Sequence, residues 1–129
     1  MKPPIVVGPA TAQDFENFTT ALYGKPAQAP YRVRAFAARV EDRVVGIGGI
    51  AFLPNNVRLM FADLTDEARQ YPMALHKAGL AAVKLAKEMG IPRLAATSES
   101  HPAGERWLLR LGFEKREVNG LRVYVLELP

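Results

Sequence analysis

Three β-rich segments in a row give way to a long stretch of helical spacing near the middle of the chain. The segments are "YRVRAFAARV" (31–40), "RVVGIGGIAFL" (43–53) and "VRLMFADL" (57–64). Short turns separate them, so they predict three consecutive antiparallel strands. From Tyr71 to Met89 the apolar residues instead recur every three or four positions, which predicts an amphipathic helix that Gly90 ends.

The flanking sequence adds elements on both sides of this block. Before it, a strand at 5–10 leads into a helix at 11–22, with Thr11 as the N-cap. After it, the pattern predicts a strand at 91–100, a helix at 102–112, and a hairpin of strands 113–118 and 121–128 around Asn119-Gly120. The order β-α-β-β-β-α-β-α-β-β predicts an α/β (α+β) fold, with a mixed, mostly antiparallel sheet of about seven strands and helices on both faces. Residues 1–129 are expected to form a single domain.

Composition narrows the classes of function. The chain has no cysteine, which excludes disulfides, thiolate nucleophiles and thiolate metal sites, and no other metal site is predicted. No apolar run approaches the roughly 20 residues of a membrane span, and the N-terminus lacks the features of a signal peptide, so a cytoplasmic protein without a membrane partner is expected. The 17 basic residues are dispersed, which favours ordinary solvated faces over a nucleic-acid surface.

Four stretches carry a resemblance to a known family over nearly the whole chain. They are, in order, "IVVGPATAQDF", "ARVEDRVVGIGGIAFL", "LAKEMGIPRLAATSES" and "WLLRLGFEKREVNG". Together they resemble the GCN5-related N-acetyltransferases, which have the GNAT fold. The resemblance implies that acetyl-coenzyme A lies in a V-shaped gap between the fourth and fifth strands, with its pyrophosphate on backbone N–H groups of the next turn. The implied reaction is transfer of an acetyl group to an amine.

The family motif for that turn, Q/RxxGxG/A, aligns with Arg69 to Ala74, and Pro72 stands at its central glycine. Proline has no N–H group to donate. The resemblance therefore implies a weaker cradle for acetyl-coenzyme A, whose cofactor-binding residues are Leu64, Arg69, Gln70, Tyr71, Met73 and Ala74. The alternative is that Pro72 only opens a helix and that Arg69 is a solvated side chain.

The resemblance also leaves the catalytic groups open. Leu108 stands where many family members carry a tyrosine acid, and leucine cannot donate a proton. His101 replaces a frequent asparagine; it could act as a base or an acid with Glu99 orienting it, or be an exposed loop histidine. Asp63 could deprotonate the attacking amine, directly or through water, or could cap the turn at Thr65.

Two further patterns are assigned to structure. Trp107 forms an apolar helix face with Leu108 and Leu111 and is expected to be part of the core. "GIGGI" (46–50) lies inside a predicted strand, so it is not a nucleotide-binding fingerprint.

Two functions follow from the resemblance. The first is an acyl-CoA-dependent N-acyltransferase, with a small-molecule or protein amine as acceptor. The second is a catalytically weak or inactive GNAT-fold protein used for binding or assembly. The "HP…WLLRLGF" ending looks similar to small phage-encoded proteins of virions or morphogenesis, which would place the chain in a host cytoplasm or a virion. A homo-oligomer or a larger assembly is compatible with either function.

Overall fold

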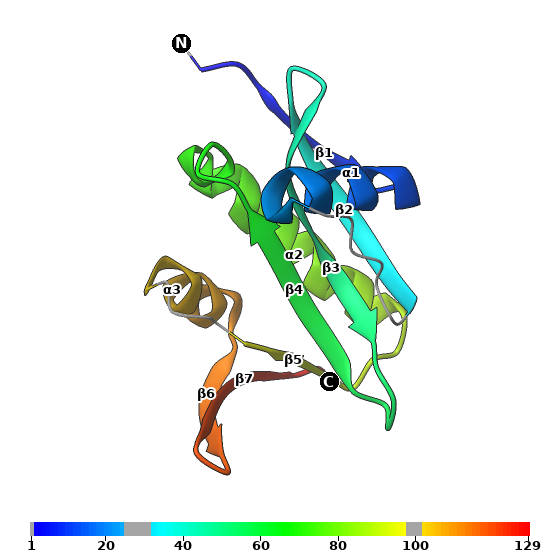
Figure 1. The fold of residues 1–129 in the computed structure, drawn as a ribbon. Coiled ribbons are helices and arrows are strands. Elements are labelled where there is room, and N and C mark those ends of the chain that lie inside the picture. Colours follow the sequence, from blue (N-terminus) through cyan, green and yellow to red (C-terminus); the bar gives the residue numbers. More distant parts are fainter. Residues whose placement is uncertain (1, 25–31, 98–101) are drawn as a thin grey trace.

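The computed structural model describes residues 2–24, 32–97 and 102–129. Its strands and main helices follow the predicted order (Figure 1). They are β1 (Ile5–Pro9), α1 (Ala12–Tyr23), β2 (Arg32–Val40), β3 (Arg43–Phe52), β4 (Arg58–Leu64), α2 (Pro72–Glu88), β5 (Arg93–Ala96), α3 (Pro102–Leu111), β6 (Glu114–Val118) and β7 (Leu121–Glu127). One element was not predicted: a short 3-10 helix, η1 (Ala68–Gln70), lies between β4 and α2.

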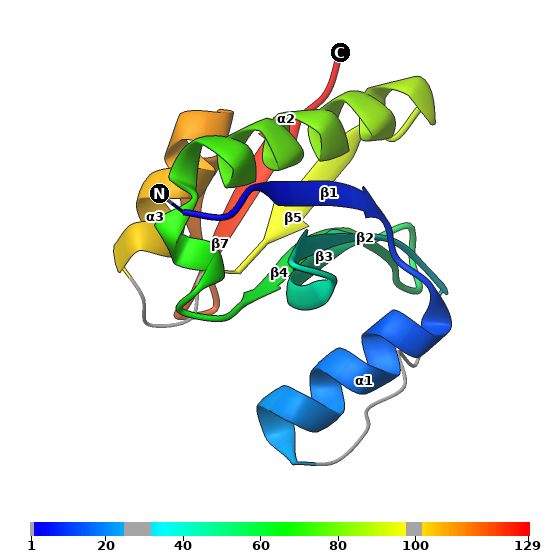
Figure 2. The same cartoon turned by 90° about the horizontal axis from the view of Figure 1, so that it is seen from above.

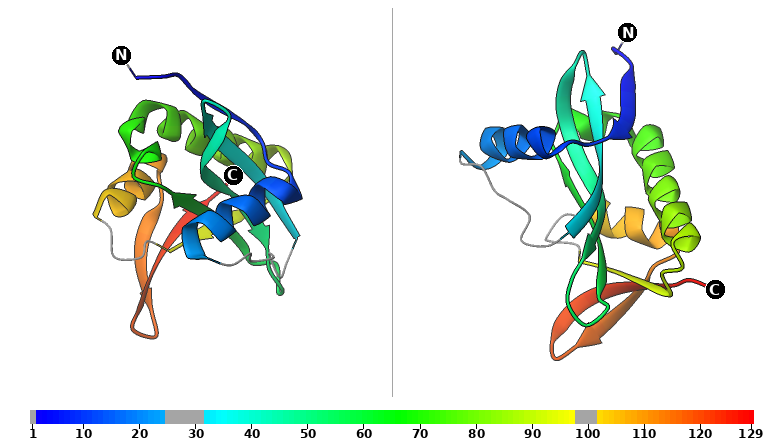
Figure 3. Two further views of the ribbon diagram at one scale, coloured as in Figure 1. Left: turned by 45° about the horizontal axis from the view of Figure 1, so that its top comes forward. Right: turned by 90° about the vertical axis from the view of Figure 1, so that its right-hand side faces the viewer.

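All seven strands belong to one sheet, in the order β1-β2-β3-β4-β5-β7-β6. Every neighbouring pair is antiparallel except β4 and β5, which are parallel. Helix α1 lies on one face of the sheet, and α2 and α3 lie on the other (Figures 2 and 3). The mixed, mostly antiparallel sheet with helices on both faces is therefore confirmed.

The two faces of the sheet have separate cores, because successive strand residues point to opposite sides. On the first face, Phe18 of α1 packs with Ala37 and Ile47. On the second face, Ile50 and Met60 belong to the larger cluster that α2 and α3 cover. The sheet is thus buried on both sides in its central strands.

The tight turns have the backbone that the sequence predicted. Asn119 and Gly120 both have positive φ, 53° and 80°, and join β6 to β7. Such a pair of positive angles is the turn whose twist matches a two-residue hairpin. The "GIGGI" segment lies within β3, as expected. Its Gly49 has φ of +156°, and a Cβ atom there would lie 2.0 Å from the carbonyl oxygen of Arg34, so no larger residue fits.

The fifth strand begins two residues later than predicted, at Arg93, because the N–H of Ile91 donates to Ala86 at 3.0 Å and closes the end of α2. It runs to Ala96 in the described residues, and positions 98–100 of the predicted strand lie outside them. The predicted catalytic residues His101 and Glu99 lie outside the described residues. Among the helices in the described ranges, none is both long enough and apolar enough to cross a bilayer.

Candidate functional site

Strands β4 and β5 part soon after they meet. Their only register pair in the described residues is Leu59 with Ala95, although β4 continues to Leu64 (Figure 1). On its other side β4 stays paired with β3 along its whole length. Within the described residues, which leave out 98–101 after β5, the second half of β4 therefore has one edge without a strand neighbour.

The register with β3 decides which β4 groups point into this gap. The N–H of Thr65 donates to Val45 at 3.0 Å, just beyond the register pair Leu64–Gly46. Hydrogen-bonded and non-bonded pairs alternate along an antiparallel ladder, so the backbone groups of Leu64 and Ala62 point away from β3. Two N–H donors of β4 thus face the gap. Leu64 was a predicted site residue; Ala62 was missed, because only the strand register identifies it.

The gap leads to the N-terminus of α2. Pro72 is the first residue of the helix, and the first helical hydrogen bond runs from the N–H of Leu75 to the carbonyl of Tyr71 at 3.0 Å. The N–H groups of Met73 and Ala74 have no acceptor among the described residues, and no side chain caps this end. Two of the predicted donors are therefore available to a ligand.

The other two predicted donors are already engaged. The N–H of Gln70 donates to Glu67 at 3.2 Å, and the N–H of Tyr71 donates to Ala68 at 3.1 Å. Both bonds belong to η1, which the sequence did not reveal. A phosphate at this turn would have to compete with them.

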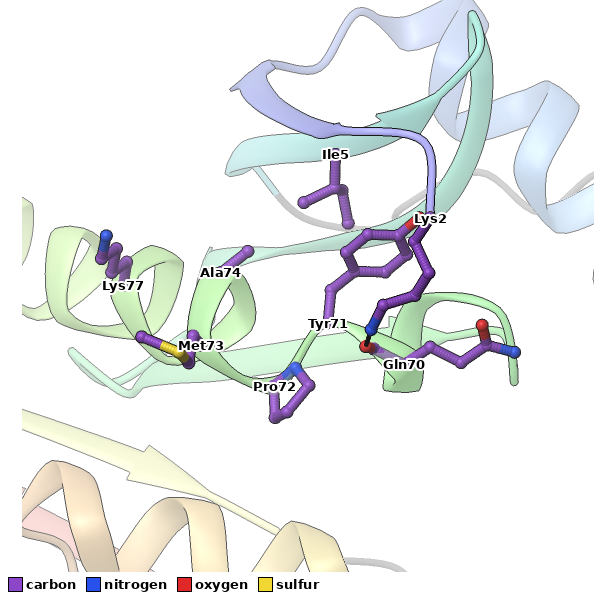
Figure 4. A pocket seen from close by; sticks show the side chains of 8 residues that line it. All are labelled: Lys2, Ile5, Gln70, Tyr71, Pro72, Met73, Ala74 and Lys77. Carbon is purple, nitrogen blue, oxygen red and sulfur yellow. Dashed lines mark hydrogen bonds between the residues drawn. The ribbon is translucent and has the colours of Figure 1, made fainter.

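A pocket of about 600 Å³ lies beside the N-terminus of α2 (Figure 4). Contacts of Lys2 and Tyr71 hold the N-terminal segment beside this pocket. The Lys2 ammonium donates to the carbonyl of Gln70, and it lies 4.8 Å from the centre of the Tyr71 ring. The Tyr71 hydroxyl donates to the carbonyl of Pro3 at 2.6 Å. The pocket is lined by Lys2, Ile5, Gln70, Tyr71, Pro72, Met73, Ala74 and Lys77. Lys2 was missed, because 68 residues separate it from Gln70 and no local pattern connects them.

Two ion pairs, Arg69 with Asp66 and Arg43 with Glu67, surround this turn. Arg69, predicted to hold the pyrophosphate, pairs with Asp66 at 3.2 Å. Arg43 donates two hydrogen bonds to Glu67, at 2.7 and 3.0 Å. This guanidinium lowers the pKa of the Glu67 carboxyl, and Glu67 in turn raises the pKa of Arg43.

Asp63 is the one predicted catalytic residue that lies in the described part of the chain. Asp63 is half-buried and opposite Ile47, on the face that α1 covers. Leu108 is 8% exposed and lies in the core beneath α3. Trp107 packs against the same core, as predicted, but also lines a cavity beside β4.

No family model matches the chain, and no curated protein sequence matches it. Several solved structures are nevertheless similar to it in fold. A GNAT acetyltransferase from Staphylococcus aureus superposes with a TM-score of 0.71 at 12% identity, covering 98% of this chain and 100% of its own. The IAA acetyltransferase from Bacillus cereus gives a TM-score of 0.70 at 16% identity, with 97% and 100% covered.

A third similar structure was solved with a bound ligand. The acetyltransferase from Bacillus subtilis, solved in complex with CoA, gives a TM-score of 0.64 at 13% identity and covers 99% of this chain and all of its own. Identities this low establish architecture alone. The strand order, the parted β4 and β5, and these superpositions agree: the chain has the GNAT fold.

Proposed function

We propose that this chain transfers an acyl group, acetyl in the first instance, from a coenzyme A thioester to an amine. The observation that carries the proposal is the open edge of β4, where the N–H groups of Ala62 and Leu64 face the gap. This edge ends at a helix N-terminus that also has open N–H groups. The structural likeness to acetyltransferases, one of them solved with CoA, supports this choice of donor.

Some residues at the N-terminus of α2 are suited to bind an acyl-CoA, and others are not. Met73 and Ala74 offer N–H donors at the positive end of the helix, which suits a pyrophosphate. Lys77 lines the adjoining pocket and adds positive charge. Pro72 contributes no donor, and Gln70 and Tyr71 donate within η1. We therefore infer a site that binds acetyl-CoA weakly, with Arg69 contributing only if it leaves Asp66.

Acetyl-CoA, as the substrate, supplies an acyl group that is activated as a thioester. One of the N–H groups of Ala62 and Leu64, which lie two residues apart on β4, donates to its carbonyl oxygen and stabilises negative charge there, and the other donates to a carbonyl of the coenzyme A arm. Asp63 accepts the proton that the amine loses, directly or through a water molecule. His101, with Glu99 to orient it, is the second candidate for that proton. Leu108 has no proton to give, so the departing sulfur is protonated from solvent.

Calorimetry with acetyl-CoA up to millimolar concentration tests binding, and thiol release in the presence of small amines and peptides tests transfer. Replacing Asp63 by Asn should lower kcat by at least about tenfold, because a general base typically contributes more than that, while acetyl-CoA affinity stays the same. Thermal denaturation of the variant shows whether its fold is intact. Absence of both heat and thermal stabilisation in the wild-type protein contradicts the proposal.

Three observations favour a second function, a GNAT-fold protein that binds or assembles without efficient catalysis. Pro72 lacks a donor, η1 engages two of the predicted N–H groups, and Leu108 is buried where an acid would be expected. The first two affect the turn that would hold the pyrophosphate, and the third affects the position of the acid. Such a protein would act in a homo-oligomer or a larger assembly, of the phage type or another.

The two functions differ in a measurable way. The acyltransferase binds acetyl-CoA and releases thiol only when an amine is present. A binding protein takes up acetyl-CoA without amine-dependent release, and an assembly component does neither. Light scattering of the purified chain, with and without acetyl-CoA, then reports whether assembly depends on the ligand.

A further inference from the structure

The described lining of the pocket beside the N-terminus of α2 carries positive charge only. Two ammonium groups, those of Lys2 and Lys77, line the pocket, and no carboxylate is among its described lining residues. Neither ammonium forms an ion pair with a described residue, so both charges are uncompensated within the described chain. A hollow of about 600 Å³ with two such cations suits an anion that carries several negative charges, as the phosphate groups of coenzyme A do.

Lys2 is brought to this pocket by the N-terminal segment, and it contacts the turn before α2 directly (Figure 4). Its ammonium donates to the carbonyl of Gln70 and lies 4.8 Å from the centre of the Tyr71 ring. The Tyr71 hydroxyl donates to the carbonyl of Pro3 at 2.6 Å, which fixes the residue next to Lys2. Ile5 and Tyr71 also pack against the same core cluster. The ammonium is therefore held at a defined place, although its side chain is exposed.

This place is close to the donor that Pro72 lacks. Only two residues separate Gln70 from Met73, so the carbonyl that holds the ammonium lies within about 10 Å of the first open N–H group of α2. An ammonium has three N–H donors, and the Gln70 carbonyl accepts one of them. The flexible four-carbon stem of lysine lets the ammonium turn toward an anion at the helix end.

We propose that Lys2 is a phosphate-binding residue of the acyl-CoA site, and that its ammonium adds a charged donor at the turn where Pro72 offers none. This inference rests on the proposed function. In the free protein the ammonium donates to the neutral carbonyl of Gln70, and in the complex it donates to a phosphate oxygen of the acyl-CoA. A hydrogen bond between two charged groups is stronger than one to a neutral carbonyl, so this exchange favours the bound state.

Calorimetry with acetyl-CoA tests the role of Lys2 against a matched control. Lys2→Met removes the charge but keeps an unbranched side chain, and it should weaken acetyl-CoA binding about tenfold, because a hydrogen bond to a charged group typically contributes that much. Lys84→Met removes another exposed lysine that does not line the pocket, and it should bind acetyl-CoA as the wild type does. Lys2→Arg keeps the charge and should retain most of the affinity.

The 3′-dephospho form of acetyl-CoA identifies which phosphate Lys2 contacts. If the difference between wild type and Lys2→Met persists with this ligand, the ammonium contacts the diphosphate. If the difference disappears, the ammonium contacts the 3′-phosphate. Either result supports Lys2 as a phosphate-binding residue.

Salt separates a charge contact from a purely structural role of Lys2. The ratio of the Lys2→Met and wild-type dissociation constants should shrink as NaCl rises from about 20 mM to about 0.5 M, because ions screen exposed charges. A variant that only loosens the turn would give a ratio that salt does not change. All variants carry any purification tag at the C-terminus, and thermal denaturation shows whether each is folded.

The inference is overturned if Lys2→Met binds acetyl-CoA as tightly as the wild type, if Lys84→Met is weakened equally, or if the ratio does not depend on salt. Each of these results leaves the proposed function standing, because the wild type still binds acetyl-CoA. If no acyl-CoA binds to the wild type, the proposed function itself fails and this inference falls with it.

Discussion

The two long helices that follow strands, α1 and α2, begin in opposite ways. At α1, the Thr11 hydroxyl accepts from the N–H of Asp14 at 3.0 Å, and the Asp14 carboxylate accepts from the N–H of Thr11 at 2.8 Å. Arg39 of β2 adds an ion pair to Asp14 at 2.5 Å. At α2, Tyr71 provides no cap, and the chain around it is held from outside by Lys2 and Pro3.

The difference separates a structural helix end from one that suits a ligand. The capping box at α1 satisfies N–H donors that would otherwise be open, so no acceptor is needed there. The N-terminus of α2 keeps open donors at Met73 and Ala74 while contacts from the N-terminal segment keep the turn in place. An open helix end of this kind is stable only because a distant part of the chain supports it.

Breaking the α1 end should produce the largest loss of stability. Asp14→Ala removes half of the capping box and the partly shielded ion pair with Arg39, and we expect a loss of about 2 kcal/mol. Urea unfolding measures it. Thr11→Ala, which removes only the hydroxyl acceptor, is the matched control and should cost about 1 kcal/mol. Equal stability of wild type and Asp14→Ala would show that the cap contributes nothing.

Changing the α2 end should alter binding more than stability. Pro72→Gly restores one N–H at the helix end, and we expect acetyl-CoA affinity to rise by about 1 kcal/mol, or about fivefold. Calorimetry measures this. Pro72→Ala has the N–H but also a Cβ atom, so it separates the missing donor from the need for close approach. If neither variant binds more tightly, the turn does not contact phosphate.

Weakening the outside support of α2 should have a smaller effect. Tyr71→Phe keeps the ring beneath Lys2 but loses the hydrogen bond to Pro3, and we expect a cost of about 1 kcal/mol or less. Hydrogen exchange of the amides in residues 2–9 should increase while that of α1 stays unchanged. Equal exchange at both places would contradict the view that this contact holds the segment.

Acid should weaken the N-terminal end of α1, and this is the smallest expected effect. Hydrogen bonds from the Thr11 backbone N–H, and then from Arg39, lower the pKa of Asp14 below its ordinary value. The stability from this carboxylate is present above the unfolded pKa, about 4, and is lost as the pH falls through the folded pKa. The difference between wild type and Asp14→Asn should therefore shrink below about pH 4. A constant difference from pH 7 to pH 3 would argue against this linkage.

Much of the fold could be predicted because its signals are local. Thr11 as the N-cap of α1, Asn119 with Gly120, and the change from strand to helical spacing near residue 70 all operate within a few residues, and each was confirmed. The missed features also depend on local hydrogen bonds, but on bonds that the hydrophobic spacing does not show. In η1 the N–H of Tyr71 donates to Ala68, and the bond from Ile91 to Ala86 closes α2 and delays the start of β5.

The candidate site was less predictable than the fold. The sequence indicated Leu64 and the turn at 69–74, but not Ala62, whose N–H faces the gap only because of the register between β3 and β4. It assigned Trp107 to the core without indicating that this residue would also line a cavity beside β4. Strand register and cavities arise between segments that are far apart in the chain, so local sequence patterns do not predict them.

The sequence by itself determined the order of the elements, the ends of α1, and the absence of a proline donor and a tyrosine acid at positions 72 and 108. Only the tertiary structure decided which backbone donors stay open, that Lys2 supports the start of α2, and that Trp107 lines a cavity together with β4. The reason is physical: side-chain type and local hydrogen bonding are properties of neighbours in sequence, whereas an open edge or a shared cavity exists only after strands and helices have packed.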